Sequence, residues 1–143
     1  MVIVAAIDSS ERASDVLDQA TELAEKFDDG IHLAHVMKQS EVIASKESDI
    51  QTGERTDMDE MRAIAREFGL KMLDGRPATV EVEVVGLIGN PADTIVQYAA
   101  EQEARYIVVS PKRQSQTGKI LFGSVAQSIL LNADCPVVSF TND

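Results

Sequence analysis

Short apolar runs alternate with stretches of helical periodicity along the chain. Most of the runs are continuous and rich in β-branched residues, as in strands buried on both faces. The strand-like runs cover residues 2–7, 31–37, 79–85, 106–109 and 136–140. Between them, apolar residues recur every three or four positions, which predicts helices. The helical faces cover residues 13–27, 58–72, 92–100 and 125–133.

This order of elements predicts an α/β fold. Strands that alternate with helices form a parallel sheet with helices on both faces, so we expect a three-layer α/β/α, doubly wound architecture. At 143 residues, one domain spanning 1–143 is the simplest organisation. The run at 79–85 alternates valine and glutamate and is therefore expected near a sheet edge. Residues 38–57 are polar without a sustained period, which predicts a surface excursion.

Three turn signals mark element boundaries. Asp28, Asp29 and Gly30 are expected to stop the first helix, with Gly30 in the C-terminal position that glycine favours. Asn90 and Pro91 are expected to start the third helix, with Asp93 at the acidic position of a capping box. Gly89, just before them, could leave room for a close approach by a ligand.

Composition and charge narrow the function classes. The chain is 44% hydrophobic but only 4% aromatic, so its core must be aliphatic. The excess of 24 acidic over 13 basic residues, a net charge of −11, disfavours nucleic acid and anionic membranes as partners. Such an acidic surface is compatible with a salt-rich cytoplasm. The alternative is that it serves only to keep the protein soluble. The first apolar run is too short for a signal or membrane span, so a cytoplasmic protein is expected.

The segment from Ser110 to Ser124 is the strongest candidate for chemistry. It follows a predicted strand, carries Lys112, Arg113 and Lys119, and ends at Gly123, where a helix begins. Backbone N–H groups in the first turn of a helix have no partner within the helix, and the helix dipole favours anions there. The segment is therefore a potential phosphate cradle.

An acidic residue follows the first predicted strand, at Asp8. In doubly wound sheets, ligands bind beyond the carboxyl ends of the strands, where the winding reverses. If the first and fourth strands are neighbours, Asp8 and the Ser110–Ser124 segment flank one crevice. The carboxylate could then accept hydrogen bonds from a ribose hydroxyl or an adenine amine. The alternative is that Asp8 only caps a helix.

Several other sites are disfavoured. Ile120 stands where a P-loop needs serine or threonine, and the dinucleotide G-x-G-x-x-G motif is absent. His32 and His35 lie three apart on one predicted strand and so face opposite sides of the sheet. Because the single cysteine, Cys135, is far away and is expected to be a small buried residue, a metal site is disfavoured. No Ser-His-acid grouping can be assembled.

Four motifs together resemble the universal stress protein family over nearly the whole chain. They are Asp8-Ser9 after the first strand, Gly89-Asn-Pro91, Gly123-Ser124-Val125 and the closing run at 133–138. The resemblance implies a five-stranded parallel sheet of order 3-2-1-4-5, as in adenine nucleotide alpha hydrolase-like folds. In that order the first and fourth strands are neighbours, as the crevice requires.

Many members of this family bind ATP or AMP through the spacing G-x2-G-x9-G-[ST]. Gly123 and Ser124 match its last two positions, whereas Ser110 and Arg113 replace its first two glycines. Ser110 is a mild change. Glycine allows backbone torsions and close approaches that arginine resists, so Arg113 either clamps the phosphates with its guanidinium or closes the site.

The resemblance also implies further contacts with the nucleotide, which is ATP or AMP, with or without Mg²⁺. Asp8 and the backbone around Val36 would hold the nucleoside, and Ala6 would line the adenine side. Val109 and Val125 would add backbone contacts beside the phosphate loop.

Family members commonly dimerise through the last strand, whose apolar residues here are Val137, Val138 and Phe140. An apolar edge strand favours aggregation unless it is covered, and pairing with a second copy gives a two-fold dimer. We therefore expect a cytoplasmic, homodimeric stress-response module that senses an adenine nucleotide. The alternative is a dimeric interaction module of the same fold that binds no nucleotide. An enzyme is disfavoured because nothing in the 110–124 segment supplies an evident general base.

Overall fold

A computed structural model of the chain describes residues 1–8, 11–41, 58–111, 113–114 and 120–140, and of residues 113–114 and 120–121 it describes the backbone alone. The strands are β1 (Val2–Ile7), β2 (Gly30–Met37), β3 (Val82–Ile88), β4 (Tyr106–Val108), β5 (Arg113–Gln114), β6 (Ile120–Leu121) and β7 (Val137–Val138). The helices are α1 (Ala13–Phe27), α3 (Met58–Leu73), α4 (Pro91–Glu101) and α5 (Ser124–Asn132).

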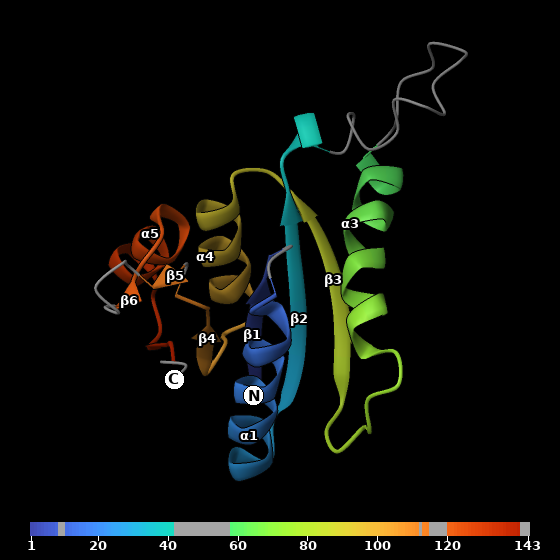
Figure 1. Cartoon of the computed structure of the whole chain (residues 1–143), viewed down its shortest axis with the longest axis vertical. Helices are drawn as coiled ribbons and strands as arrows, with labels where there is room; N and C mark the ends of the chain where they lie inside the picture. Colours follow the sequence, from blue (N-terminus) through green and yellow to red (C-terminus); the bar gives the residue numbers. More distant parts are fainter. Residues whose placement is uncertain (9–10, 42–57, 112, 115–119, 141–143) are drawn as a thin grey trace.

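Five of these strands form one parallel sheet in the order β3-β2-β1-β4-β7 (Figure 1). This is the predicted order 3-2-1-4-5, counted over the strands of the sheet. The winding reverses at β1, which pairs with β2 on one side and with β4 on the other. The third strand of the sheet lies at an edge, as predicted. β5 and β6 form a separate antiparallel pair in the segment before α5.

Helices cover both faces of the sheet, so the three-layer prediction is confirmed. Aliphatic side chains fill both interfaces, as the low aromatic content predicts. The face covered by α1 and α3 contains Ile3, Ile7, Val16, Leu17, Leu33 and Val84. The face covered by α4 and α5 contains Val4, Ala34, Ile95, Val109, Ala126 and Ile129.

The predicted role of Gly30 and the predicted start of the third strand are wrong. α1 ends at Phe27, where its periodicity ends, but its C-cap is Asp28 rather than Gly30: Asp28 adopts the left-handed conformation with φ of 56°, and its N–H donates to the Ala24 carbonyl. Aspartate tolerates this conformation, which leaves Gly30 free to pair with Val2 in β2. The third strand begins at Val82 rather than Thr79 and continues to Ile88.

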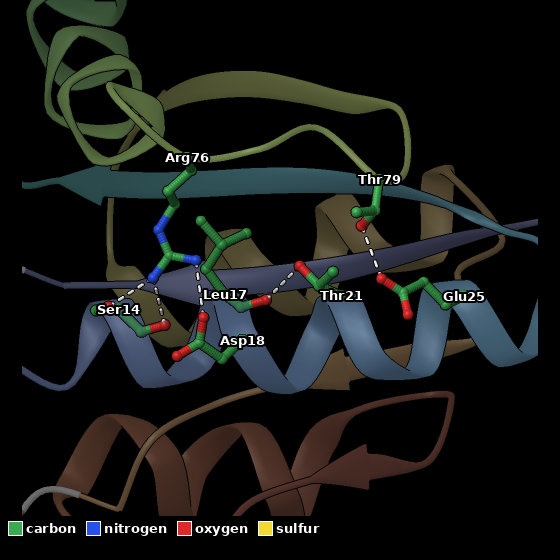
Figure 2. A network of polar contacts seen from close by, with 7 residues as sticks. All are labelled: Ser14, Leu17, Asp18, Thr21, Glu25, Arg76 and Thr79. Carbon is green, nitrogen blue, oxygen red and sulfur yellow. Dashed lines mark hydrogen bonds and ion pairs between the residues drawn. The ribbon is translucent and has the colours of Figure 1, made fainter.

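Long-range contacts explain the later start of β3. The segment before it is tied to α1 instead of to β2 (Figure 2). Arg76 donates to the Asp18 carboxylate at 2.8 Å and to the Ser14 hydroxyl at 2.6 Å, and Thr79 donates to Glu25 at 2.7 Å. These bonds hold residues 76–79 over α1, so strand pairing begins only beyond them.

The expected start of the helix at residue 90 is confirmed. The Asn90 side chain accepts a hydrogen bond from the Asp93 N–H at 3.1 Å, and Pro91 opens α4. Gly89 has φ of 148°, and a Cβ there would lie 2.6 Å from the Thr94 hydroxyl. The close approach at Gly89 is therefore made by a side chain of α4.

The last helix is less buried than its periodicity indicates. α5 packs against α4 through Ala126 and Ile129, but Val125 and Leu130 are 43% and 42% exposed. The prediction of a five-residue buried face is wrong at these two positions, because α5 covers the end of the sheet and packs inward through one narrow stripe.

Candidate functional site

A cavity of about 390 Å³ lies at the carboxyl ends of β1, β2 and β4. The described residues that line it are Ala6, Ile7, Asp8, His35, Val36, Lys38, Glu41, Pro91, Ile95, Val109, Ser110, Gly123, Ser124, Val125, Ala126 and Ile129. Its position is the one expected for a ligand site in a doubly wound sheet, beside the strand where the winding reverses.

The topology brings the predicted site residues together. Because β1 and β4 are neighbours, Asp8 after β1 and Ser110 after β4 meet at one edge of the sheet. All predicted site residues whose side chains the structure describes line the cavity, and Arg113, described by its backbone alone, lies in β5. Gly89 is also absent from the described lining, so the sequence-based idea that it makes room for a ligand is not supported.

The first turn of α5 forms one wall of the cavity. Gly123 is its N-cap residue, with φ of −72° and ψ of 170°, and as a glycine it has no side chain to cap the helix. The start of α4 also reaches the cavity, at Pro91, but Asn90 caps that helix. The N-terminus of α5 therefore has backbone donors available for an anion, whereas that of α4 has already used one.

Asp8 also lines the cavity, at the end of β1. The alternative interpretation, in which Asp8 caps the following helix, is wrong. α1 begins at Ala13, and Arg12 occupies the N-cap position. Asp8 is exposed, and Lys38 and Glu41 beyond the end of β2 add charges of both signs to the lining.

His35 is the most informative residue that sequence reasoning left outside the site. It is only 7% exposed, and its Nδ1 lies 3.1 Å from the Ala65 carbonyl of α3. Burial lowers the pKa of His35, against the opposing effects of the Ala65 carbonyl and of the charges on Asp8 and Glu41. The feature of the sequence that could have indicated His35 as a lining residue is its position next to Val36, near the end of a predicted strand.

His32, on the same strand, lies on the other face of the sheet, as predicted. Its Nδ1 is 2.7 Å from the Tyr98 hydroxyl of α4, and its Nε2 is 3.2 Å from the Glu83 carboxylate. His32 is not among the residues that line the cavity. Within the described part of the chain, no three His, Cys, Asp or Glu residues group as metal ligands would.

The backbone at Arg113 bears on whether this residue is compatible with the site. Arg113 pairs with Leu121 in the antiparallel β5–β6 ladder, so its backbone is extended. Among the described residues, the non-glycine residues with positive φ are Asp28 and Glu103. The conformational objection to arginine at this position therefore does not apply to the structure.

The described helices include none that is both long and apolar enough to cross a membrane.

Cys135 is only partly buried, and burial raises the pKa of its thiol.

Comparisons with known proteins all point in one direction. The Universal stress protein family model matches residues 1–140. The chain is 28% identical over 141 residues to "Universal stress protein YxiE" of Bacillus subtilis, covering 95% of each chain. It is 26% identical over 144 residues to "Universal stress protein MJ0531" of Methanocaldococcus jannaschii, covering 95% of this chain and 79% of the relative.

Solved structures agree with this. A universal stress protein from Archaeoglobus fulgidus is 28% identical and superposes with a TM-score of 0.67, covering 98% of this chain and 97% of the other. The universal stress protein from Archaeoglobus fulgidus solved in complex with dAMP is 25% identical, with a TM-score of 0.64 and coverage of 98% and 96%.

Proposed function

The chain belongs to the universal stress protein family, and from this premise we propose that it binds an adenine nucleotide, ATP or AMP, as a sensed ligand. The binding site is the cavity at the carboxyl ends of β1, β2 and β4. The nucleotide acts through its presence rather than through its turnover, so no catalytic role is assigned to any residue. The protein is a stress-response module of the cytoplasm, built as one domain.

One observation carries this proposal. The cavity is lined both by the acidic residue Asp8 and by the N-terminus of α5, whose N-cap glycine has no side chain to bond the first-turn N–H groups. Phosphate oxygens accept hydrogen bonds from the backbone N–H groups at Ser124 and Val125, and the helix dipole favours their charge. The sugar hydroxyls face Asp8, which accepts from them, and the base lies along Ala6 and Val36.

Similarity supports the choice of nucleotide. The universal stress protein from Archaeoglobus fulgidus that was solved in complex with dAMP aligns with 98% of this chain. Adenine and at least one phosphate are common to dAMP, AMP and ATP. This likeness therefore favours adenine nucleotides as the ligand class but does not distinguish AMP from ATP. Mg²⁺ is usually bound through substrate phosphates, so its effect is best measured with ATP, which carries three.

The direct test begins with the purified protein. It is denatured, and released adenine nucleotide is sought by chromatography. If none is released, ATP and AMP are titrated calorimetrically into the folded protein, with and without magnesium. Saturable binding with one site per chain is expected. A flat titration with folded protein would refute the proposal.

A variant at the helix start locates the ligand. Gly123→Val places a branched side chain where the phosphate is expected and should abolish binding. The matched control is Ser128→Val, one turn further along α5, since Ser128 is not among the cavity-lining residues. Unchanged affinity in Gly123→Val would mean that the ligand sits elsewhere.

Arg113 offers a second variant. It replaces a glycine of the family's nucleotide-binding pattern, and its extended backbone is compatible with a side chain. We propose that its guanidinium contacts the phosphates. Arg113→Gly should then weaken binding, and more for ATP than for AMP because ATP carries more negative charge. Tighter binding by this variant would mean that Arg113 blocks the site.

We also propose that the protein is a homodimer joined through β7. β7 is an edge strand of the sheet, and within the described part of the chain Val137 and Val138 pair with β4 alone, next to Phe140. α5 carries no acidic or basic residue and leaves Leu131 77% exposed close in sequence to this edge. Val138→Lys should give a monomer by sedimentation, whereas Glu101→Lys, a charge change on α4, should not.

The alternative function is a dimeric interaction module that binds no nucleotide. Replacement of two family glycines by Ser110 and Arg113 favours it. The two functions separate in one pair of measurements: a stable dimer with a flat ATP and AMP titration supports the alternative, and a stable dimer with saturable binding supports the nucleotide sensor.

A further inference from the structure

β3 forms the edge of the sheet opposite β7 (Figure 1). Its bonds to β2 show which of its backbone groups are used: the Glu81 carbonyl accepts from the Ile31 N–H at 2.9 Å, and the Gly89 N–H donates to the Met37 carbonyl at 3.0 Å. Successive strand residues direct their backbone groups to alternate sides, so the odd-numbered residues of β3 face β2 and the even-numbered ones face away. The residues whose backbone groups could pair with another strand are therefore Val82, Val84, Gly86 and Ile88.

α3 covers this edge at Gly86. Glycine has no side chain, so the burial of Gly86 is burial of its backbone. The α3 backbone lies against it, because a Cβ on Gly86 would be 2.5 Å from the Arg66 backbone nitrogen. A strand from another molecule therefore cannot reach the backbone at Gly86 unless α3 moves.

At Val84, a side chain closes the edge instead. The Arg66 Nε donates to the Val84 carbonyl oxygen at 3.1 Å. That carbonyl faces away from β2, so the guanidinium occupies the place that the N–H group of an added strand would take. Arg66 is an exposed residue, which puts its charge at the solvent side of the edge. Charged side chains on an edge strand oppose pairing with another chain.

The open part of the edge lies before Val84. Residues 78–83 line a broad hollow there, and Val82 is the residue of β3 in this hollow whose backbone groups face outward. One residue is too little for a ladder, whereas two are enough in this fold, since β7 is held to β4 through two residue pairs. Arg66 therefore acts at the position where the open edge would become long enough to pair.

We propose that Arg66 closes the β3 edge to strand addition by a second copy of the chain and so confines self-association to β7. The second part of this statement rests on the proposed homodimer through β7. A copy with two open edges would pair at both ends of its sheet, and such contacts extend into open assemblies instead of a closed dimer. Closure of β3 leaves one edge for pairing, which limits the assembly to two copies.

The test is sedimentation equilibrium with β7 already blocked by Val138→Lys. Adding Arg66→Ala frees the Val84 carbonyl and allows one more residue pair with two backbone hydrogen bonds. Self-association should then strengthen by about tenfold, and the mass should rise towards that of two chains. Glu81 and Glu83 are exposed on the same stretch and would repel their counterparts in a second copy. The measurement therefore uses about 1 M salt, which screens this repulsion.

Arg62→Ala in the same background is the matched control. It removes the same charge from α3 one turn earlier, but the Arg62 guanidinium donates to Asp59 of its own helix at 3.4 Å. This variant should keep the mass of the background protein, and so should Arg66→Lys, which retains a charged donor. Equal association of the Arg66→Ala and Arg62→Ala proteins would overturn the inference. If Val138→Lys alone does not lower the mass of the parent protein, the proposed β7 dimer fails, and the comparison of the two arginine variants still decides the inference.

Amide hydrogen exchange provides a test on the unmodified protein, in which no variant has to fold. The Val82 N–H faces away from β2. The Val137 N–H faces away from β4, since the carbonyls of Pro136 and Val138 accept from that strand. As the protein concentration rises, exchange at Val137 should slow while exchange at Val82 stays constant. Slowing at Val82 would mean that copies already meet at β3, which contradicts the inference, whereas no change at either residue would refute the β7 dimer alone.

Discussion

A single methyl group at Gly86 should destabilise the fold strongly. Gly86 lies in β3, and the backbone of α3 crosses directly over it. A Cβ at this position would overlap the Arg62 carbonyl oxygen, lie 2.5 Å from the Arg66 backbone nitrogen and lie 3.0 Å from the Arg66 Cα. These are backbone atoms within a helix, so no side-chain rotation can relieve the overlap. Gly86→Ala therefore requires α3 to move away from the sheet.

The size of the effect follows from what that movement disrupts. Overpacking of a well-packed interior costs about 1–3 kcal/mol and occasionally more. Here, movement of α3 also strains the bond from Arg66 to the Val84 carbonyl and loosens the packing of Met61 and Ala65. We expect the upper end of that range, about 3 kcal/mol. This is a large share of the roughly 5–15 kcal/mol that stabilises a typical domain.

Urea denaturation followed by circular dichroism measures this loss. With a slope of about 2 kcal/mol per molar urea, a loss of about 3 kcal/mol lowers the midpoint by about 1.5 M. The matched control is Gly30→Ala in β2, where a Cβ would meet the Glu81 carbonyl oxygen at 3.5 Å and the Glu81 Cβ at 4.0 Å, both ordinary contact distances. Gly30→Ala should leave the midpoint unchanged or raise it slightly, since alanine restricts the unfolded chain. Equal midpoints for the two variants would refute the reasoning.

Three further predictions concern other parts of the fold. The hydrogen bond from Arg105 holds the pKa of the buried Asp29 below its usual value, so its contribution to stability is full above about pH 4 and fades as the pH falls further. Asp29→Asn should be less stable at pH 7 by urea denaturation, and the difference should shrink near pH 3. Burial, with the charges of Glu83 and Glu101, raises the pKa of Tyr98 to about 12. Its neutral form stabilises the fold below about pH 10, and that stabilisation should be lost as the pH rises from 10 towards 12. Ultraviolet titration should show one tyrosine ionising late, and Tyr98→Phe should remove that step. Asn90→Ala removes the cap of α4 and should cost about 1 kcal/mol in thermal or urea unfolding.

The sheet and the location of the candidate site could be predicted because both depend on local patterns. Continuous β-branched runs mark buried parallel strands, and the loops after them must meet at one edge. Asp8 and Gly123 could therefore be assigned to the same region from the sequence alone. The structure places both in the cavity lining.

The errors arise where a distant contact decides the outcome. Thr79 has the alternation of a strand residue, but its hydroxyl donates to Glu25, 54 positions away, and β3 starts later. Leu130 has the spacing of a buried helical residue, but α5 has no neighbour over that side within the described chain. Periodicity gives the faces of a helix without showing how many of them are covered.

His35 was missed for the same reason. Its sequence position predicts only which side of the sheet it faces. Its significance comes from α3, because Ala65 fixes the tautomer and Phe68 covers the ring, and both are about 30 residues away. Nothing in the sequence near His35 indicates that α3 lies close enough for these contacts. The absence of a side chain at Gly86, beside His35 in register, is what lets the helix approach.

The residues that line the cavity therefore differ in physical character. The α5 wall offers fixed backbone donors whose strength does not change with pH, and it suits a phosphate at any physiological condition. His35 of β2 is the one described lining residue whose pKa burial moves, and Ala65 and Phe68 hold its ring on the α3 side of the sheet. α3 itself contributes no residue to the described lining, so a shift of α3 would leave the Gly123 turn untouched.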